Sequence, residues 1–137
     1  MLQVQEFVGI YHADGGLRGE AAYVLGKFLG TAHCTLCDIT HSPVRRKPSW
    51  DAMVSRLGVP FRLLHRNERD TEVLAATGDS PAVLVRVAGR VGLAPLLGRA
   101  EIEPILGSVP AFEGVLRGAV VQAGLVLPGS ADPAHWR

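Results

Sequence analysis

Cysteine is scarce in this sequence, and both cysteines, Cys34 and Cys37, fall in one short segment. A structural disulfide framework needs more cysteines at wider spacing. A bridge between two residues this close in the chain closes a very short loop and adds little stability through chain entropy. We therefore expect this pair to serve chemistry rather than structural cross-linking.

A charge imbalance and long hydrophobic runs are also missing. The formal net charge is +1 over 137 residues, so composition gives no electrostatic reason to expect nucleic acid or an anionic membrane as a partner. No apolar run approaches the ~20 residues that cross a bilayer. Residues 1–7 include Glu6 and lack the basic and apolar regions of a secretory signal, so a cytoplasmic protein is the expectation.

Three common ligand-binding and catalytic motifs are absent from the sequence. There is no Gly-x4-Gly-Lys-Ser/Thr phosphate loop, no Gly-x-Ser-x-Gly nucleophile elbow and no Gly-x-Gly-x-x-Gly fingerprint. We therefore expect neither nucleotide hydrolysis nor serine hydrolysis, and no nucleotide cofactor.

The composition that remains is typical of one globular domain. Hydrophobic residues make up 47% of the chain and charged residues 20%, which is enough apolar material for a packed core. No internal repeat or second domain is visible. We expect one domain over residues 1–127 and a loose C-terminal tail over residues 128–137.

Hydrophobic periodicity predicts a mixed succession of strands and helices. Alternating apolar residues predict strands at 4–12, 59–65, 82–87 and 91–96. Helical spacing with end signals predicts helices at 17–29, 50–57, 69–77, 99–106 and 112–123. A strand–helix–strand crossover gives a parallel pair, and the later hairpin adds antiparallel strands. The expected fold is an α/β mixed sheet with helices on both faces.

The segment Ser80-Pro81-Ala82-Val83-Leu84-Val85 places a proline at the start of the predicted hairpin strand. Together with the element order over about residues 4–107, it resembles the thioredoxin-like fold superfamily. The resemblance implies a thioredoxin-like mixed sheet flanked by helices, with a cis Ser80–Pro81 bond facing the active site. A trans proline that opens a strand is the alternative.

The cysteine pair departs from that family pattern. The family carries its redox dithiol directly after the first strand, where this chain has Ala13-Asp14-Gly15-Gly16. Here the pair follows about one helix later, so we expect a Cys/His-containing insertion after the first helix. This stretch, Cys-x-Leu-Cys-x-x-Thr-His, is also similar to one in small uncharacterised bacterial proteins.

The chemistry of the chain is concentrated in the segment His33-Cys34-Thr35-Leu36-Cys37-Asp38-Ile39-Thr40-His41. If this stretch is helical, Cys34, Cys37 and His41 share one face, and a turn-like Cys-x-x-Cys knuckle is the other geometry. Two thiolates and an imidazole suit a thiophilic metal ion, Zn(II) or Cu(I). A structural zinc site takes four ligands. The candidates for the fourth ligand are His33, His12 and Asp38.

Two other functions remain open beside metal binding. In a thiol–disulfide oxidoreductase, Cys34 would attack a substrate disulfide and Cys37 would resolve the mixed disulfide. His33, or the basic run 45–47 if it folds back, would lower the pKa of the attacking thiol. In a non-enzymatic ligand- or partner-binding module, both cysteines would be buried small hydrophobes. The sequence does not choose between a metal ion and a disulfide substrate, and it leaves the oligomeric state open.

Overall fold

The computed structural model describes residues 2–12, 35–42, 45–78 and 80–128. Several expectations lie outside these residues. They are the segment at 13–16, the helix at 17–29, the part of the insertion before Thr35 and all of the expected tail except Pro128.

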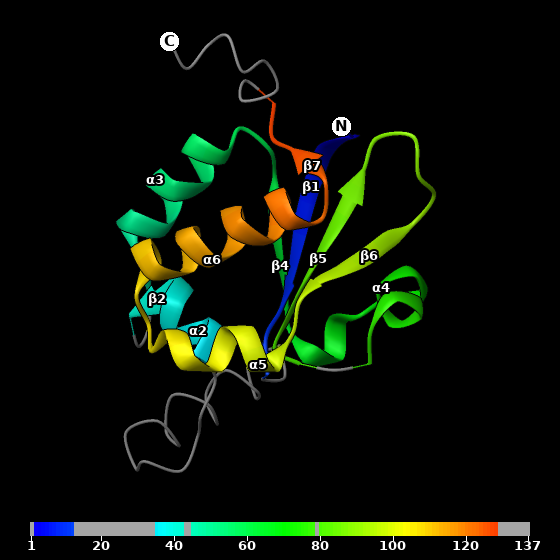
Figure 1. Ribbon diagram of the computed structural model, residues 1–137. Helices are drawn as coiled ribbons and strands as arrows, with labels where there is room; N and C mark the ends of the chain where they lie inside the picture. The colour runs from blue at the N-terminus through cyan, green and yellow to red at the C-terminus, as the bar shows by residue number, and fades with distance from the viewer. Residues whose placement is uncertain (1, 13–34, 43–44, 79, 129–137) are drawn as a thin grey trace, which may run out of the picture.

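A mixed five-stranded sheet forms the centre of the described fold (Figure 1). Its strands are β1 (Leu2–Ile10), β4 (Phe61–Leu64), β5 (Ala82–Val87), β6 (Leu93–Leu97) and β7 (Leu125–Val126). The strand order is β4-β1-β5-β6, and β7 pairs with β1. β1 is parallel to β4, and β5 is antiparallel to both β1 and β6. The predicted parallel pair and the predicted antiparallel hairpin are both confirmed.

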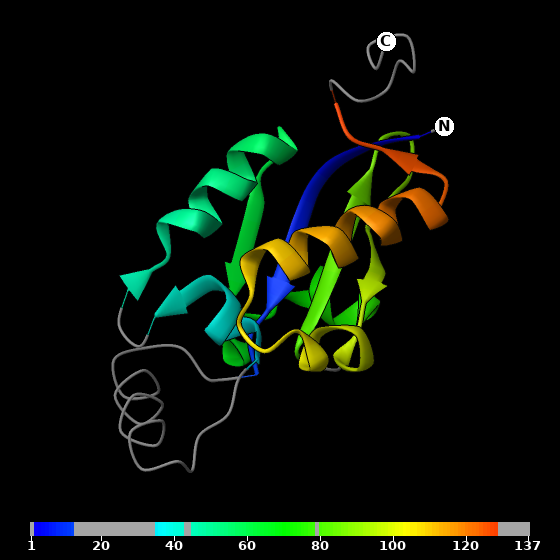
Figure 2. The same ribbon diagram turned by 60° about the vertical axis from the view of Figure 1, so that its left-hand side comes forward.

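Helices cover both faces of this sheet (Figures 1 and 2). The α-helices are α2 (Thr35–Thr40), α3 (Pro48–Leu57), α4 (Thr71–Ala76), α5 (Arg99–Ile102) and α6 (Val109–Gln122). The 3₁₀ helices are η1 (Arg66–Glu68) and η2 (Glu103–Ile105), and a separate hairpin pairs β2 (His41–Ser42) with β3 (Arg45–Arg46). α3 and α6 pack on one face, whereas Val73 of α4 packs on the other.

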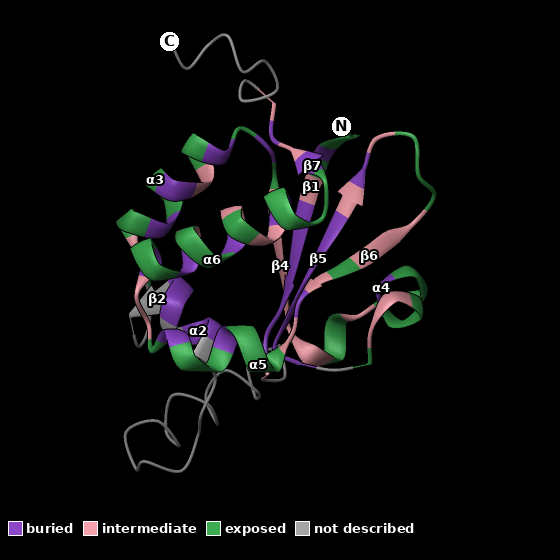
Figure 3. Cartoon of the chain, in the orientation of Figure 1, coloured by how far each residue is buried: buried purple, intermediate pink, exposed green. Residues whose placement is uncertain are grey.

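The larger core lies between the sheet and helices α3 and α6, where Figure 3 colours the buried parts of these elements purple. Trp50 is buried within an aromatic group. Its ring lies 4.9 Å from that of Phe61 and 5.4 Å from that of Phe112, and the ring of Phe7 lies 5.4 Å from that of Phe61. Burial of several large rings supplies much of the hydrophobic driving force for closing α3 and α6 onto the sheet.

Proline explains two helix boundaries that differ from the prediction. α3 begins at Pro48, because proline suits the first helical position, where a backbone N–H has no partner. The expected helix at 99–106 is α5 followed by the 3₁₀ helix η2, which contains Pro104. A proline in the helix interior removes a hydrogen bond and ends the regular α-helix.

Several chain segments meet at the end of the sheet where the carboxyl ends of β1 and β4 lie, and we call this end of the sheet the carboxyl edge. Ile10, the last residue of β1, pairs with Leu64 of β4 and with Ala82 of β5. The residues after β1, the residues after β4 and the residues before β5 therefore meet there. The Ser80–Pro81 bond at this edge is cis, as the resemblance implies, so the trans alternative is wrong.

Within the described ranges, no helix has the length and apolar composition needed to cross a membrane.

Candidate functional site

Polar groups from four segments gather at the carboxyl edge of the sheet. We call this group the strand-end cluster. It comprises Tyr11, His12, Cys37, Thr40, His65 and Ser80. In α/β proteins the carboxyl ends of parallel strands are the usual place for ligands, because loops there bring groups from separate strands together.

Tyr11 and Thr40 join the end of β1 to helix α2. The Tyr11 hydroxyl lies 2.8 Å from Thr40 Oγ1, and the Thr40 hydroxyl donates to the Cys37 carbonyl oxygen at 3.3 Å. Because the Thr40 proton is used on that carbonyl, the Tyr11 hydroxyl is the donor to Thr40. Tyr11 is 4% exposed and Thr40 is 0% exposed, so this link is shielded from water.

The Tyr11 hydroxyl stays protonated over the ordinary pH range. Burial raises the pKa of Tyr11 to about 12, although the hydrogen bond with Thr40 and the charge of Arg46 act in the opposite direction. Tyr11 also places its ring 5.2 Å from the His65 ring in an edge-on arrangement. The hydroxyl is therefore a fixed hydrogen-bond donor that holds α2 in place.

Cys37 lies on α2 and is nearly buried, with 9% of its surface exposed. It is disulfide-bonded. The sequence contains one other cysteine, Cys34, so Cys34 is the partner available within one chain, although it lies outside the described residues. The sulfur of Cys37 is thus in a covalent bond with a second sulfur, at the edge of the sheet where β1 ends.

Ser80 is held from two sides at the same edge. Its hydroxyl lies 2.8 Å from His12 Nδ1, and its carbonyl oxygen accepts a 2.7 Å hydrogen bond from an Arg99 guanidinium nitrogen. Ser80 is 4% exposed. These contacts fix the residue before Pro81 in relation to the end of β1 and the start of α5.

The basic run at 45–47 folds back on helix α2. His41 and Arg46 are partners in the β2–β3 hairpin, and the Lys47 backbone N–H donates to the Thr40 carbonyl oxygen at 2.8 Å. Arg46 forms an ion pair with Asp51 at 2.8 Å, and its charge also lowers the pKa of Tyr11. The sequence analysis assigned the basic run an effect on the attacking thiol only if the run folds back, and it does return to helix α2.

The predicted metal ligands are only partly visible. Cys37 and His12 are both in the strand-end cluster, whereas Cys34 and His33 lie outside the described residues. Of the two geometries that the sequence left open, the helical one does not extend to His41, because α2 ends at Thr40 and His41 pairs with Arg46 in β2. In the part of the chain that the structure describes, no group of three or more His, Cys, Asp or Glu residues is arranged to hold a metal ion.

Four residues of the strand-end cluster were not predicted as site residues from the sequence, namely Tyr11, Thr40, His65 and Ser80, and neither was the adjoining Arg99. Tyr11 pairs with Thr40 across 29 positions, and His12 pairs with Ser80 across 68 positions. A signal for Ser80 did exist, since it precedes the proline of the resemblance. Nothing local marks Tyr11, because a tyrosine in an apolar strand is ordinary.

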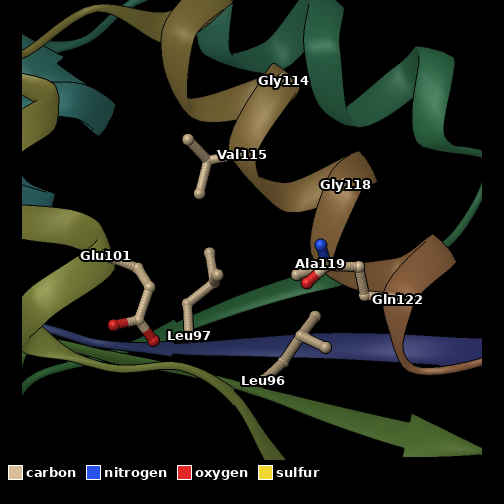
Figure 4. Close-up of a pocket in the computed structure, with 8 residues that line it drawn as sticks. All are labelled: Leu96, Leu97, Glu101, Gly114, Val115, Gly118, Ala119 and Gln122. Atoms are coloured by element: carbon tan, nitrogen blue, oxygen red, sulfur yellow. The ribbon is translucent and has the colours of Figure 1, made fainter.

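A separate groove lies between α6 and β6 (Figure 4). It has a volume of about 460 Å³ and is lined by Leu96, Leu97, Glu101, Gly114, Val115, Gly118, Ala119 and Gln122. One carboxylate and one amide are its polar side chains, and the rest of the lining is apolar or small. The strand-end cluster is therefore the stronger candidate for chemistry.

Comparisons of the chain with protein-family models, with curated proteins and with solved structures found no match.

Proposed function

We propose that this protein is a thiol–disulfide oxidoreductase of thioredoxin-like architecture that uses Cys34 and Cys37. The observation that carries the proposal is the disulfide at Cys37, at the edge of the sheet where β1 ends. A cysteine that only fills space in a core has no need of a second sulfur beside it. The mixed sheet, the helices on both faces and Pro81 directly before β5 support the architecture.

The reaction exchanges two electrons between the protein and a disulfide substrate. The thiolate of Cys34 attacks one substrate sulfur, a mixed disulfide forms, and the first substrate thiol leaves with a proton. The Cys37 thiolate then attacks the Cys34 sulfur, which forms the internal disulfide and releases the second thiol. The substrate is reduced by two electrons, the protein is oxidised by two electrons, and an external dithiol reduces the protein again.

A basic side chain returns to the helix that carries Cys37. The β2–β3 hairpin brings Arg46 to the cysteine helix. A positive charge near a thiol lowers its pKa, which raises the fraction of nucleophile at neutral pH. Tyr11 and Thr40 fix the turn of α2 that carries Cys37, so the sulfur is held in one place.

Alkylation and turnover together test this function. Protein reduced with dithiothreitol should take up two iodoacetamide groups per chain, and protein then treated with oxidised glutathione should take up none, as measured by intact mass. Reduced protein should also reduce insulin disulfides, and Cys34→Ser and Cys37→Ser should both abolish this activity. Ser55→Ala, on an exposed position of α3, is the matched control and should keep it.

Two observations would contradict this function. Two alkylated thiols after oxidation, or full insulin reduction by Cys37→Ser, would overturn the oxidoreductase proposal.

Metal binding is the second candidate, because two sulfurs close enough to bond would present two thiolates to Zn(II) or Cu(I) once reduced. Cys37 supplies one ligand from α2, Cys34 supplies the other thiolate, and His41, His33 or His12 would complete the set. Metal analysis of protein purified reduced and without a histidine tag tests it. One bound ion per chain that is lost in Cys37→Ser supports the site, and metal-free protein after incubation with zinc contradicts it.

A further inference from the structure

The groove between α6 and β6 carries a carboxylate that has no basic partner among the described residues. Glu101 lines this groove and accepts a 3.0 Å hydrogen bond from the Gly98 N–H. Leu96 and Leu97 line the same groove. Gly118 leaves it open, because a Cβ at that position would meet nothing within 4 Å. The groove therefore offers an apolar surface with one unpaired negative charge beside it (Figure 4).

The turn between β5 and β6 carries the complementary combination. Val91 has a relative exposure of 105%, the highest among the large hydrophobic residues that the structure describes. The adjacent Arg90 is also exposed, and within the described ranges no carboxylate forms an ion pair with it. An exposed valine alone is ordinary. Here, however, an apolar side chain stands next to an unpaired positive charge, and each matches a feature of the groove.

Both features lie along the same edge of the sheet, because β6 is the last strand in the order β4-β1-β5-β6. Arg90 lies five positions before Pro95, the middle residue of β6, and Glu101 lies six positions after it. A twofold axis across the middle of β6 would set the β6 strands of two copies antiparallel. Residues at similar distances before and after Pro95 then face each other, so Arg90 of each copy comes beside Glu101 of the other.

We propose that this edge is a self-association surface, on which Val91 of each copy packs into the groove of the other and Arg90 pairs with Glu101. The partner is a second copy of this chain, and the contact occurs twice in one symmetric dimer. Pro95 lacks a backbone N–H, and a proline on an edge strand opposes pairing with a further strand. Side chains therefore make the contact, and it does not depend on the chemistry of the cysteines.

Sedimentation equilibrium of the full chain, at concentrations up to about 1 mM, measures the association directly. The wild type should dimerise reversibly. Val91→Ser should raise the dissociation constant at least about tenfold, because two apolar contacts per dimer are lost. Leu106→Ser is the matched control, because Leu106 is 82% exposed and lies next to Gly107, whose carbonyl oxygen accepts from Lys47. It should leave the dissociation constant unchanged.

Charge reversal tests the pairing of Arg90 with Glu101. Arg90→Glu places carboxylates together across the twofold axis and Glu101→Arg places cations together, so each variant alone should be monomeric. An equimolar mixture of the two variants should dimerise again, because both contacts of the mixed dimer then join opposite charges. Glu101→Gln keeps an acceptor for the Gly98 N–H and should still raise the dissociation constant about tenfold.

Three results would overturn the proposal. One is a wild type that stays monomeric up to about 1 mM. Another is a dimer that disappears on adding dithiothreitol, since an intermolecular disulfide would then hold it. The third is a dimer that Val91→Ser and both charge reversals leave intact, because a different surface would then be responsible. Recovery of the dimer in the mixture, with neither charge variant dimeric alone, supports the pairing.

Discussion

Replacing Tyr11 by Phe deletes the hydroxyl that joins the end of β1 to helix α2. The hydrogen bond to Thr40 is 2.8 Å long, and both residues are buried. A neutral hydrogen bond of this kind contributes about 1 kcal/mol to the free energy of unfolding. Thr40→Val should cost more, about 1–3 kcal/mol, because it removes the acceptor of a buried donor as well as the bond from Thr40 to the Cys37 carbonyl.

The double variant separates the shared bond from the other effects of each substitution. Once Tyr11 is Phe, Thr40→Val no longer leaves a tyrosine hydroxyl without this acceptor. The two costs should therefore sum to more than the double variant loses, with a coupling of about 1 kcal/mol. At this chain length a cost of 1 kcal/mol corresponds to roughly 3–5 °C in Tm.

Urea unfolding of the four proteins, followed by far-ultraviolet circular dichroism at neutral pH, gives the required free energies. Ser55→Ala, which removes an exposed hydroxyl on α3, is the control and should change the free energy of unfolding by no more than about 0.5 kcal/mol. Strict additivity of Tyr11→Phe and Thr40→Val would refute the argument that this bond fixes α2 to the sheet.

Three further predictions concern the same fold. The pKa of Tyr11 is near 10 in the unfolded chain and about 12 in the folded protein. Between these pH values the wild type should therefore lose about 2–3 kcal/mol of stability relative to Tyr11→Phe. Identical alkaline unfolding curves for the two proteins would contradict this. Gly9→Ala places a Cβ 3.0 Å from Leu63 Cδ2 and should lower the free energy of unfolding by about 1–3 kcal/mol. Gly118→Ala meets nothing within 4 Å and should stabilise α6 by up to about 1 kcal/mol. Thermal unfolding that ranks the two variants in the reverse order would refute this packing. Phe112→Ala should cost about 3–5 kcal/mol through a cavity, and a loss below about 1 kcal/mol in urea unfolding would show that its ring is not in the core.

The sequence predicted the elements whose signals are local. The strand at 82–87 has the predicted bounds, because a short apolar run lies between a proline and a glycine turn. The helix that starts near Trp50 ends at Leu57 as expected, with Gly58 in the left-handed conformation that favours glycine. It begins at Pro48, two residues before the predicted start, because proline takes the first helical position.

The candidate site was harder to predict, because its contacts depend on the sheet register. The pairing of Ile10 with Ala82 brings His12 to Ser80, and no local pattern in one sequence specifies which residues of two distant strands face each other. Cys37 was found because its chemistry is marked by residue type alone. Arg99 was missed, since an arginine at a helix start usually lies in solvent.

Lys47 forms hydrogen bonds at the ends of three helices. Its backbone N–H bonds the end of α2, its carbonyl oxygen accepts from the Trp50 N–H at 3.0 Å at the start of α3, and its ammonium group donates to the Gly107 carbonyl at 2.7 Å just before α6. Lys47 therefore links these three helices at a point of the chain that lies outside the connection between β2 and β3. Residues inserted between β2 and β3 would leave these three hydrogen bonds of Lys47 in place, because both strands precede Lys47 in the chain.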